Sequence, residues 1–323
     1  MTIPVSPTPL YLHETTAGGN TICIKREDLL PFSFGGNKAR IGLCYLRHMQ
    51  AQGANHMLAY GNARSNLCRV LSNLCAASGY PLTILSPADD DGQQRPSMNA
   101  ALCRQLGAEI IPCQKTGVAE AVDAATEHIR AQGHIPYYIY GDRTGQGNKA
   151  TPVYAYAEQY APLMEQCKAQ FGALPDAVCL AAGTGMTLAG LLCGQSVYDH
   201  GGAALPRLIG LSVARDAETA HAHTAGYIRA FAEEQPAMAD AEAAISRIRI
   251  DDRCRGTYGA PDEAVAETIR EQFRRHGLPL DLTYTGKAYH AMLQMLAGED
   301  WQGKRIVFIH TGGTPLFFDA VMG

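Results

Sequence analysis

The chain has 323 residues, of which 46% are hydrophobic and 18% charged, a composition typical of a globular protein that is long enough for two domains. The formal net charge of -4 and the lack of a basic stripe exclude nucleic acid and a membrane surface as expected partners, which favours a small-molecule ligand. The cysteines form no CxxC pair and the N-terminal segment lacks a signal-peptide pattern, so we expect a cytoplasmic protein with reduced thiols and no metal centre.

Apolar strand patterns alternate with helical patterns along the chain, beginning with a strand at residues 20–28 and a helix at about 39–52. Strands that alternate with helices of roughly 10 to 15 residues are typical of a parallel sheet. A first series of such units fills residues 53–155. A second series includes a helix near 151–171, a strand, glycine-rich turn and helix at 176–192, a strand at 206–214, and a strand with a second glycine-rich turn at 304–318.

These patterns predict an α/β fold with two parallel-sheet domains whose loops face a shared cleft. We expect residues 1–52 and 156–323 to form the larger domain and residues 53–155 the smaller one. His221 and His223 are two positions apart, so they would not share one face of a helix and do not suggest a metal site.

Lys38 stands in the segment PFSFGGNKARIGL, directly after two glycines and an asparagine, where a loop gives way to a helical pattern. Glycine lets the backbone approach a ligand closely, and the first turn of a helix offers free N–H groups and a positive dipole end. Such a setting disfavours a cation and suits a lysine that must lose its proton. The alternative is a helix-entry loop with a solvated lysine.

The glycine-rich turn at 183–187 is the second local signal. It lies where a buried strand pattern ends and a helix begins, a position at which backbone N–H groups can bind a phosphate. The spacing is neither GxGxxG nor GxxxxGK[ST], so one compact phosphate is favoured over a nucleotide, although a purely structural turn remains an alternative. The residues of the turn are Gly183, Thr184, Gly185, Met186 and Thr187. A lysine and one phosphate together suggest pyridoxal 5′-phosphate.

Seven short motifs then occur in order along nearly the whole chain. They are PTPL at 7–10, KRED at 25–28, GGNKAR at 35–40, SN at 65–66, GTYGAP at 256–261, DLTYTGKA at 281–288 and HTGG at 310–313. In these motifs the chain resembles the D-cysteine desulfhydrase and 1-aminocyclopropane-1-carboxylate deaminase family, within the tryptophan-synthase-like, fold type II enzymes that use pyridoxal phosphate. The resemblance implies a homodimer with the cofactor in the cleft between two domains.

The resemblance also implies roles for individual residues. Lys38 would bind the cofactor as a Schiff base and then move the substrate proton. Asn66 would donate a hydrogen bond to the phenolic oxygen of the cofactor, and Ser65 would meet the substrate carboxylate. Tyr284 would lie against the pyridine ring and Tyr258 would reach the substrate. Residues 183–187 would bind the phosphate. A structural role for either tyrosine is the alternative, because the chain has 15 tyrosines.

Thr285 bears on the type of reaction. In the deaminases that the chain resembles, the residue after the stacking tyrosine is a glutamate, whose charge can keep the ring nitrogen of the cofactor protonated. A threonine hydroxyl cannot do so comparably. Thr285, together with Thr311, therefore favours elimination of a leaving group, as in the desulfhydrases, over opening of a cyclopropane ring.

Two segments depart from the family pattern. Arg64 stands where the family usually has glutamine, and the loop from Gly141 to Pro152 differs from the glycine-serine-asparagine loop expected there. That loop contains a second GNK, which makes Lys149 a rival to Lys38. We prefer Lys38 because its neighbours match the family.

The sequence thus predicts a pyridoxal-phosphate-dependent lyase that eliminates a β-substituent from a small amino acid. D-Cysteine is the favoured substrate, with pyruvate, ammonia and sulfide as products. Alternatives are a β-replacement synthase, in which Arg64 could recognise an acidic partner, a 1-aminocyclopropane-1-carboxylate deaminase, and a cofactor-binding protein without catalysis. A nucleotide-binding Rossmann protein ranks last.

Overall fold

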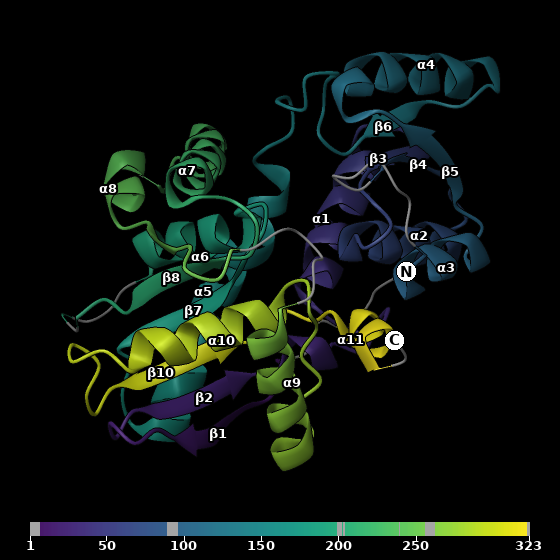
Figure 1. Cartoon of the computed structure of the whole chain (residues 1–323). Coiled ribbons are helices and arrows are strands. Elements are labelled where there is room, and N and C mark those ends of the chain that lie inside the picture. The colour runs from purple at the N-terminus through teal and green to yellow at the C-terminus, as the bar shows by residue number, and fades with distance from the viewer. Residues whose placement is uncertain are drawn as a thin grey trace.

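The computed structural model describes residues 7–88, 96–198, 202, 204–238, 240–255 and 262–321. Strands in these ranges form two sheets, which lie in different parts of the molecule, the smaller one at the upper right of Figure 1 and the larger one at the lower left. The larger sheet has the order β1-β2-β10-β7-β8-β9, and the smaller sheet has the order β5-β4-β3-β6. The predicted α/β architecture with two parallel sheets is confirmed, with one difference: β1 pairs antiparallel with β2 at the edge of the larger sheet.

The strands of the larger sheet come from both ends of the chain. They are β1 (Leu10–Thr15), β2 (Thr21–Lys25), β7 (Ala177–Ala182), β8 (Arg207–Ser212), β9 (Arg249–Asp251) and β10 (Arg305–Ile309). The smaller sheet contains β3 (His56–Tyr60), β4 (Leu82–Pro87), β5 (Glu109–Cys113) and β6 (Pro136–Tyr138). The last strand of the larger sheet, β10, lies between β2 and β7 and pairs parallel with both.

Helices cover both faces of each sheet. They are α1 (Asn37–Ala51), α2 (Asn66–Ser78), α3 (Met98–Gln105), α4 (Val118–Ala131), α5 (Thr151–Phe171), α6 (Met186–Val197), α7 (Ala217–Glu234), α8 (Ala241–Ser246), α9 (Glu263–His276), α10 (Thr285–Leu296) and α11 (Thr314–Val321), with short 3₁₀ helices at Glu27–Leu29 and Lys115–Gly117. Along β7, Val178 and Leu180 join the core cluster on the α6 side, whereas Ala177 and Cys179 join the cluster on the α10 side. Successive strand residues point to opposite faces, so a buried parallel strand needs apolar side chains at every position.

Helix α1 connects the two sheets through the core. Its side chains Ile41, Tyr45 and Met49 are fully buried, and they belong to one cluster with Met57 of β3 and Val178 of β7. The helix begins at Asn37, two residues earlier than expected, so Lys38 lies in its first turn. The buried face of the same helix packs in the core. In the described part of the chain, no helix has both the length and the apolar character to cross a membrane.

The predicted domain limits stay a prediction. The strands at 10–25 and 177–309 do share one sheet, and those at 56–138 share the other. Helix α5, however, runs from Thr151 to Phe171, so the limit between residues 155 and 156 would fall inside a helix. The C-terminal helix α11 also packs against α3, and a carboxylate oxygen of Asp319 accepts a hydrogen bond from the backbone N–H of Met98 at 3.0 Å.

Candidate functional site

One cavity of about 1100 Å³ lies between the two sheets. Residues at the carboxyl ends of strands in both sheets line it, among them Tyr60, Tyr138 and Ala182. Ligands of open α/β sheets bind outside the carboxyl ends of the strands, so this is the place at which a ligand is expected.

Most of the sequence-predicted site residues line this cavity. They are Lys38, Ser65, Asn66, Gly183, Thr184, Gly185, Met186, Thr187, Tyr284 and Thr311. The rival lysine, Lys149, lines it as well, whereas Arg64 and Thr285 do not. Tyr258 and the GTYGAP motif lie outside the described residues.

Lys38 is partly buried and no carboxylate pairs with it in the described chain. Burial alone lowers the pKa of its amine from 10.5 to about 8, because the charged form loses hydration without gaining a counter-charge. The amine is therefore much more often neutral at physiological pH than an exposed lysine would be.

The backbone before Lys38 follows a path that demands glycine. Ser33, Phe34, Gly35 and Gly36 all have positive φ angles. A Cβ on Gly35 would lie 1.9 Å from the carbonyl oxygen of Asp28, which no side chain can occupy. The GG pair of the GGNK motif is thus required by close backbone contact as well as by the left-handed conformation.

A second pair of glycines completes this contact from the far end of the chain. A Cβ on Gly312 would lie 2.5 Å from the Cα of Gly36, and the backbone N–H of Asn37 donates to the carbonyl oxygen of Thr311 at 3.0 Å. The GGNK and HTGG motifs, more than 270 residues apart, therefore form one interlocked structure at the start of α1.

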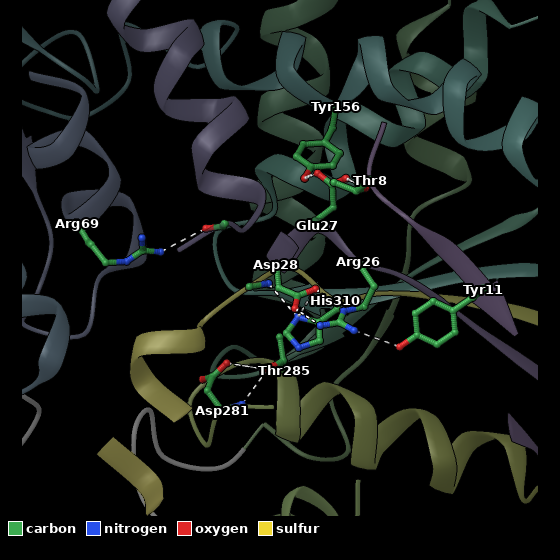
Figure 2. Close-up of polar contacts among 12 residues, drawn as sticks. Thr8, Tyr11, Arg26, Glu27, Asp28, Arg69, Tyr156, Asp281, Thr285 and His310 are labelled. Carbon is green, nitrogen blue, oxygen red and sulfur yellow. Dashed lines mark hydrogen bonds and ion pairs between the residues drawn. The ribbon is translucent and has the colours of Figure 1, made fainter. Parts of the chain in front are cut away.

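Two buried charged side chains hold this region in place (Figure 2). Glu27 accepts hydrogen bonds from Arg40 of α1 at 2.7 and 3.1 Å, from Thr8 at 2.5 Å and from Tyr156 of α5 at 2.7 Å. Burial opposes ionisation, but the hydrogen bonds and charge of Arg40 outweigh it and hold the pKa of Glu27 below its usual value. The network anchors α1 two residues beyond Lys38.

Arg69 of α2 is the second of these side chains, and it is only 1% exposed. Its guanidinium donates to the hydroxyl of Ser33 at 2.9 Å and lies within 3.5 Å of the carbonyl oxygen of Gly35. No carboxylate pairs with it among the described residues, and burial lowers its pKa to about 10. Ser65 caps the start of the same helix α2 and Asn66 is its first residue, so Arg69 connects that part of the cavity wall to the loop that precedes Lys38.

The turn at 183–187 leaves a helix start open. Gly185 has a φ of +90° and is the N-cap residue of α6, and as a glycine it has no side chain that could cap the first N–H groups of this helix. The side-chain amide of Asn37 donates to the hydroxyl oxygen of Thr187 at 2.8 Å, so the hydroxyl proton of Thr187 can point elsewhere. Free N–H groups and a directed hydroxyl are what an anion such as phosphate needs.

Asn66 and Ser65 have fixed donor and acceptor roles. The amide of Asn99, a fully buried residue of α3, donates to the Oδ1 of Asn66 at 2.9 Å, which leaves the Nδ2 of Asn66 as a donor for a ligand. Ser65 caps α2 by accepting a hydrogen bond from the N–H of Cys68 at 3.2 Å, so its hydroxyl proton also remains available.

Tyr284 and Thr285 differ in where they point. A Cβ on Gly183 would lie 3.6 Å from the Tyr284 ring, so this ring lines the cavity beside the open helix start. Thr285 is fully buried, and its hydroxyl donates to the carboxylate of Asp281 at 2.7 Å and accepts from the N–H of Asp281 at 2.9 Å (Figure 2). Asp281 thus uses both the proton and a lone pair of the Thr285 hydroxyl, and this hydroxyl does not face the cavity.

Sequence reasoning missed several residues of the site. Asn37 and Asn99 orient their neighbours as described, and Arg215 lines the cavity and donates a hydrogen bond to the carbonyl oxygen of Gly183. Arg215 follows β8, next to β7 in the sheet, and the rule that parallel strands end at one edge could have found it. Across the described ranges, no three His, Cys, Asp or Glu side chains come together as a metal site would require.

Comparisons with known proteins agree with this geometry. Residues 1–312 match the family described as pyridoxal-phosphate dependent enzyme. The chain is 28% identical to a D-cysteine desulfhydrase of Klebsiella pneumoniae, over 97% of this chain and 93% of that protein. It is also 28% identical to a Pyrococcus horikoshii protein with the provisional name 1-aminocyclopropane-1-carboxylate deaminase, over 91% and 85% of the two chains. The crystal structure of a homologue of ACC deaminase superimposes with a TM-score of 0.80 at 25% identity, over 99% of this chain and 94% of the other.

The cavity fits the cofactor of this family. Pyridoxal 5′-phosphate carries an aldehyde, a phenolic oxygen and a phosphate, and the cavity offers a partner suited to each. Lys38 would supply an amine with a lowered pKa, the Nδ2 of Asn66 would donate to the phenolic oxygen, and the open start of α6 with Thr187 would bind the phosphate. The chain belongs to the family of pyridoxal-phosphate-dependent enzymes.

Proposed function

We propose that this enzyme is a lyase that removes the α-proton and a β-substituent from a small amino acid, in the manner of a D-cysteine desulfhydrase. With D-cysteine and one water, the products would be pyruvate, ammonia and hydrogen sulfide. The homodimer, the cytoplasmic location and the two-domain division at 1–52, 53–155 and 156–323 belong to the same proposal.

The observation that carries the proposal is the absence of any aspartate or glutamate among the described residues that line the cavity. A carboxylate beside the ring nitrogen of the cofactor would keep that nitrogen protonated and strengthen electron withdrawal. Asp281 is near, but its carboxylate accepts hydrogen bonds from Thr285 and from three backbone N–H groups. A site without such a charge suits elimination, in which a leaving group carries the electrons away.

The chain's own residues would divide the work as follows. When bound, the cofactor makes the α-proton of the substrate acidic by withdrawing electrons. The neutral amine of Lys38 would take this proton, and its pKa of about 8 keeps it close to the pH at which a base works best. Ser65, whose hydroxyl oxygen already accepts from Cys68, would donate its proton to the substrate carboxylate.

The test is a product analysis on purified protein loaded with pyridoxal phosphate. D-Cysteine, L-cysteine, D-serine and 1-aminocyclopropane-1-carboxylate are supplied separately, and pyruvate, 2-oxobutyrate and ammonia are measured. We expect pyruvate and ammonia from a cysteine enantiomer and none with Lys38→Ala, whereas Lys149→Met retains turnover. 2-Oxobutyrate from the cyclopropane amino acid, without pyruvate from cysteine, would reject elimination.

A parallel incubation with an added thiol tests the β-replacement alternative. A new amino acid formed in place of pyruvate would identify a synthase. Arg64, which made this alternative attractive in the sequence, does not line the cavity and gives it no support.

A further inference from the structure

One side of the cavity is lined by basic side chains that the proposed elimination does not use. Lys149 comes from the segment before α5, Arg215 from the end of β8, and His223 from α7. We call these three residues the cationic wall. The described lining residues of the cavity include no acidic side chain that could balance it.

The three groups lie close to one another. Arg215 and Lys149 both add to the effect of burial in lowering the pKa of His223, which is the effect of neighbouring positive charge. Lys149 reaches toward α7, because its amine lies 3.4 Å from the place where a Cβ on Gly226 would stand. Neither the side-chain amine of Lys149 nor the imidazole of His223 has a hydrogen bond or ion pair with another side chain or backbone group of the described chain. With its pKa lowered, the imidazole of His223 is mainly neutral near pH 7 and can donate one hydrogen bond, while Lys149 and Arg215 supply the positive charge. An anion between Lys149 and Arg215 would relieve the repulsion between these two like charges.

We propose that the cationic wall binds a second anionic group of the substrate, such as a carboxylate, sulfonate or phosphate on its side chain. This inference rests on the proposed function and narrows its substrate class, from small amino acids in general to those that carry a second negative charge. D-Cysteine has no such group before it reacts; its sulfur becomes negatively charged only as the carbon–sulfur bond breaks.

The phosphate of the cofactor is the other anion that the cationic wall could bind. It already has the open start of α6 and the hydroxyl of Thr187, whereas Lys149 and His223 come from other elements. The cavity of about 1100 Å³ is slightly larger than the usual ligand site of roughly 300–1,000 Å³, so it has room beyond the cofactor. Lys149 also stands in the loop 141–152, the segment that departs from the family pattern and is therefore free to set a specificity of its own.

The test compares aspartate with asparagine, which have nearly the same size and differ in side-chain charge. Calorimetry on the holoenzyme measures the dissociation constants of both compounds in each enantiomer. We expect the preferred enantiomer of aspartate to bind at least about tenfold more tightly than the matching asparagine, as charge-assisted hydrogen bonds provide. Lys149→Met and His223→Gln should each remove most of this ratio. Lys168→Met, which removes a positive charge outside the cavity, should leave it unchanged.

Retention of the cofactor, measured by equilibrium dialysis of the same variants, separates the two anions. A ratio near one in the unmodified protein overturns the proposal. The proposal is also overturned if Lys149→Met retains the cofactor less well but has an unchanged ratio of aspartate to asparagine affinity. That result would mean that the cationic wall binds only the cofactor phosphate. Pyruvate release from D-cysteine is assayed alongside. If no pyruvate forms while the preference for aspartate over asparagine persists, the proposed elimination is rejected and the anion subsite is supported.

Discussion

The lowered pKa of Lys38 predicts a specific pH dependence for its reaction with an aldehyde. An amine with a pKa of 10.5 is neutral in about one molecule in a thousand at pH 7.5, whereas one with a pKa of about 8 is neutral in roughly one in four. The neutral form is the nucleophile, so Lys38 should react roughly two hundred times more readily than an ordinary lysine at that pH. This advantage should disappear above about pH 10.5, where both amines are neutral.

The assay is a pH series on protein from which the cofactor has been removed. Each sample is mixed briefly with pyridoxal 5′-phosphate and a free lysine derivative as an internal reference, reduced with borohydride, and digested for mass spectrometry. We expect the tag on the peptide that contains Lys38, with a midpoint near pH 8, and the same curve in Lys149→Met. A midpoint near 10.5, or a tag on Lys149 instead, would refute the reasoning about burial.

Three further predictions concern the structure around Lys38. Arg40→Met should lower the free energy of unfolding in urea by about 3–5 kcal/mol, because it leaves Glu27 buried without its partner, and Glu27→Gln in the same chain should restore part of the loss. Because the pKa of Glu27 is lowered in the folded state, its contribution is complete above its ordinary value of 4.5 and is lost as the pH falls below it; acid unfolding of Glu27→Gln should show a weaker pH dependence there. Gly36→Ala, which places a Cβ 2.9 Å from the oxygen of Thr311, should cost about 1–3 kcal/mol and weaken cofactor retention in dialysis, whereas Gly53→Ala, with positive φ but open space, should retain the cofactor normally.

Much of the fold could be predicted from local patterns. Parallel strands buried on both faces read as short apolar runs, and the glycines at 35–36 and 183–185 mark places where the backbone must turn or approach closely. The same pattern marked Lys38 as a candidate site residue before the structure was known, because a lysine that follows two glycines and begins a helix is expected to lie close to a ligand.

The rest depends on contacts between segments far apart in the chain. Nothing near Asn66 indicates that Asn99 of another helix fixes its amide, and the direction of the Thr285 hydroxyl follows from the turn that Asp281 makes four residues earlier. The antiparallel pairing of β1 was equally hidden, because an edge strand and a central strand can have similar apolar patterns. These details decide which atoms face a ligand, and local sequence does not contain them.

The position of β10 also determines when during synthesis the site can form. This strand is near the C-terminus, yet it lies between β2 and β7, and the turn after it packs against the glycines that precede Lys38. A ribosome-bound chain therefore carries β2 with one edge unpaired until residues 305–309 have emerged. Ribosome-bound or truncated chains that end before residue 305 should be unable to bind pyridoxal 5′-phosphate. The exposed edge of β2 would make such chains prone to aggregate.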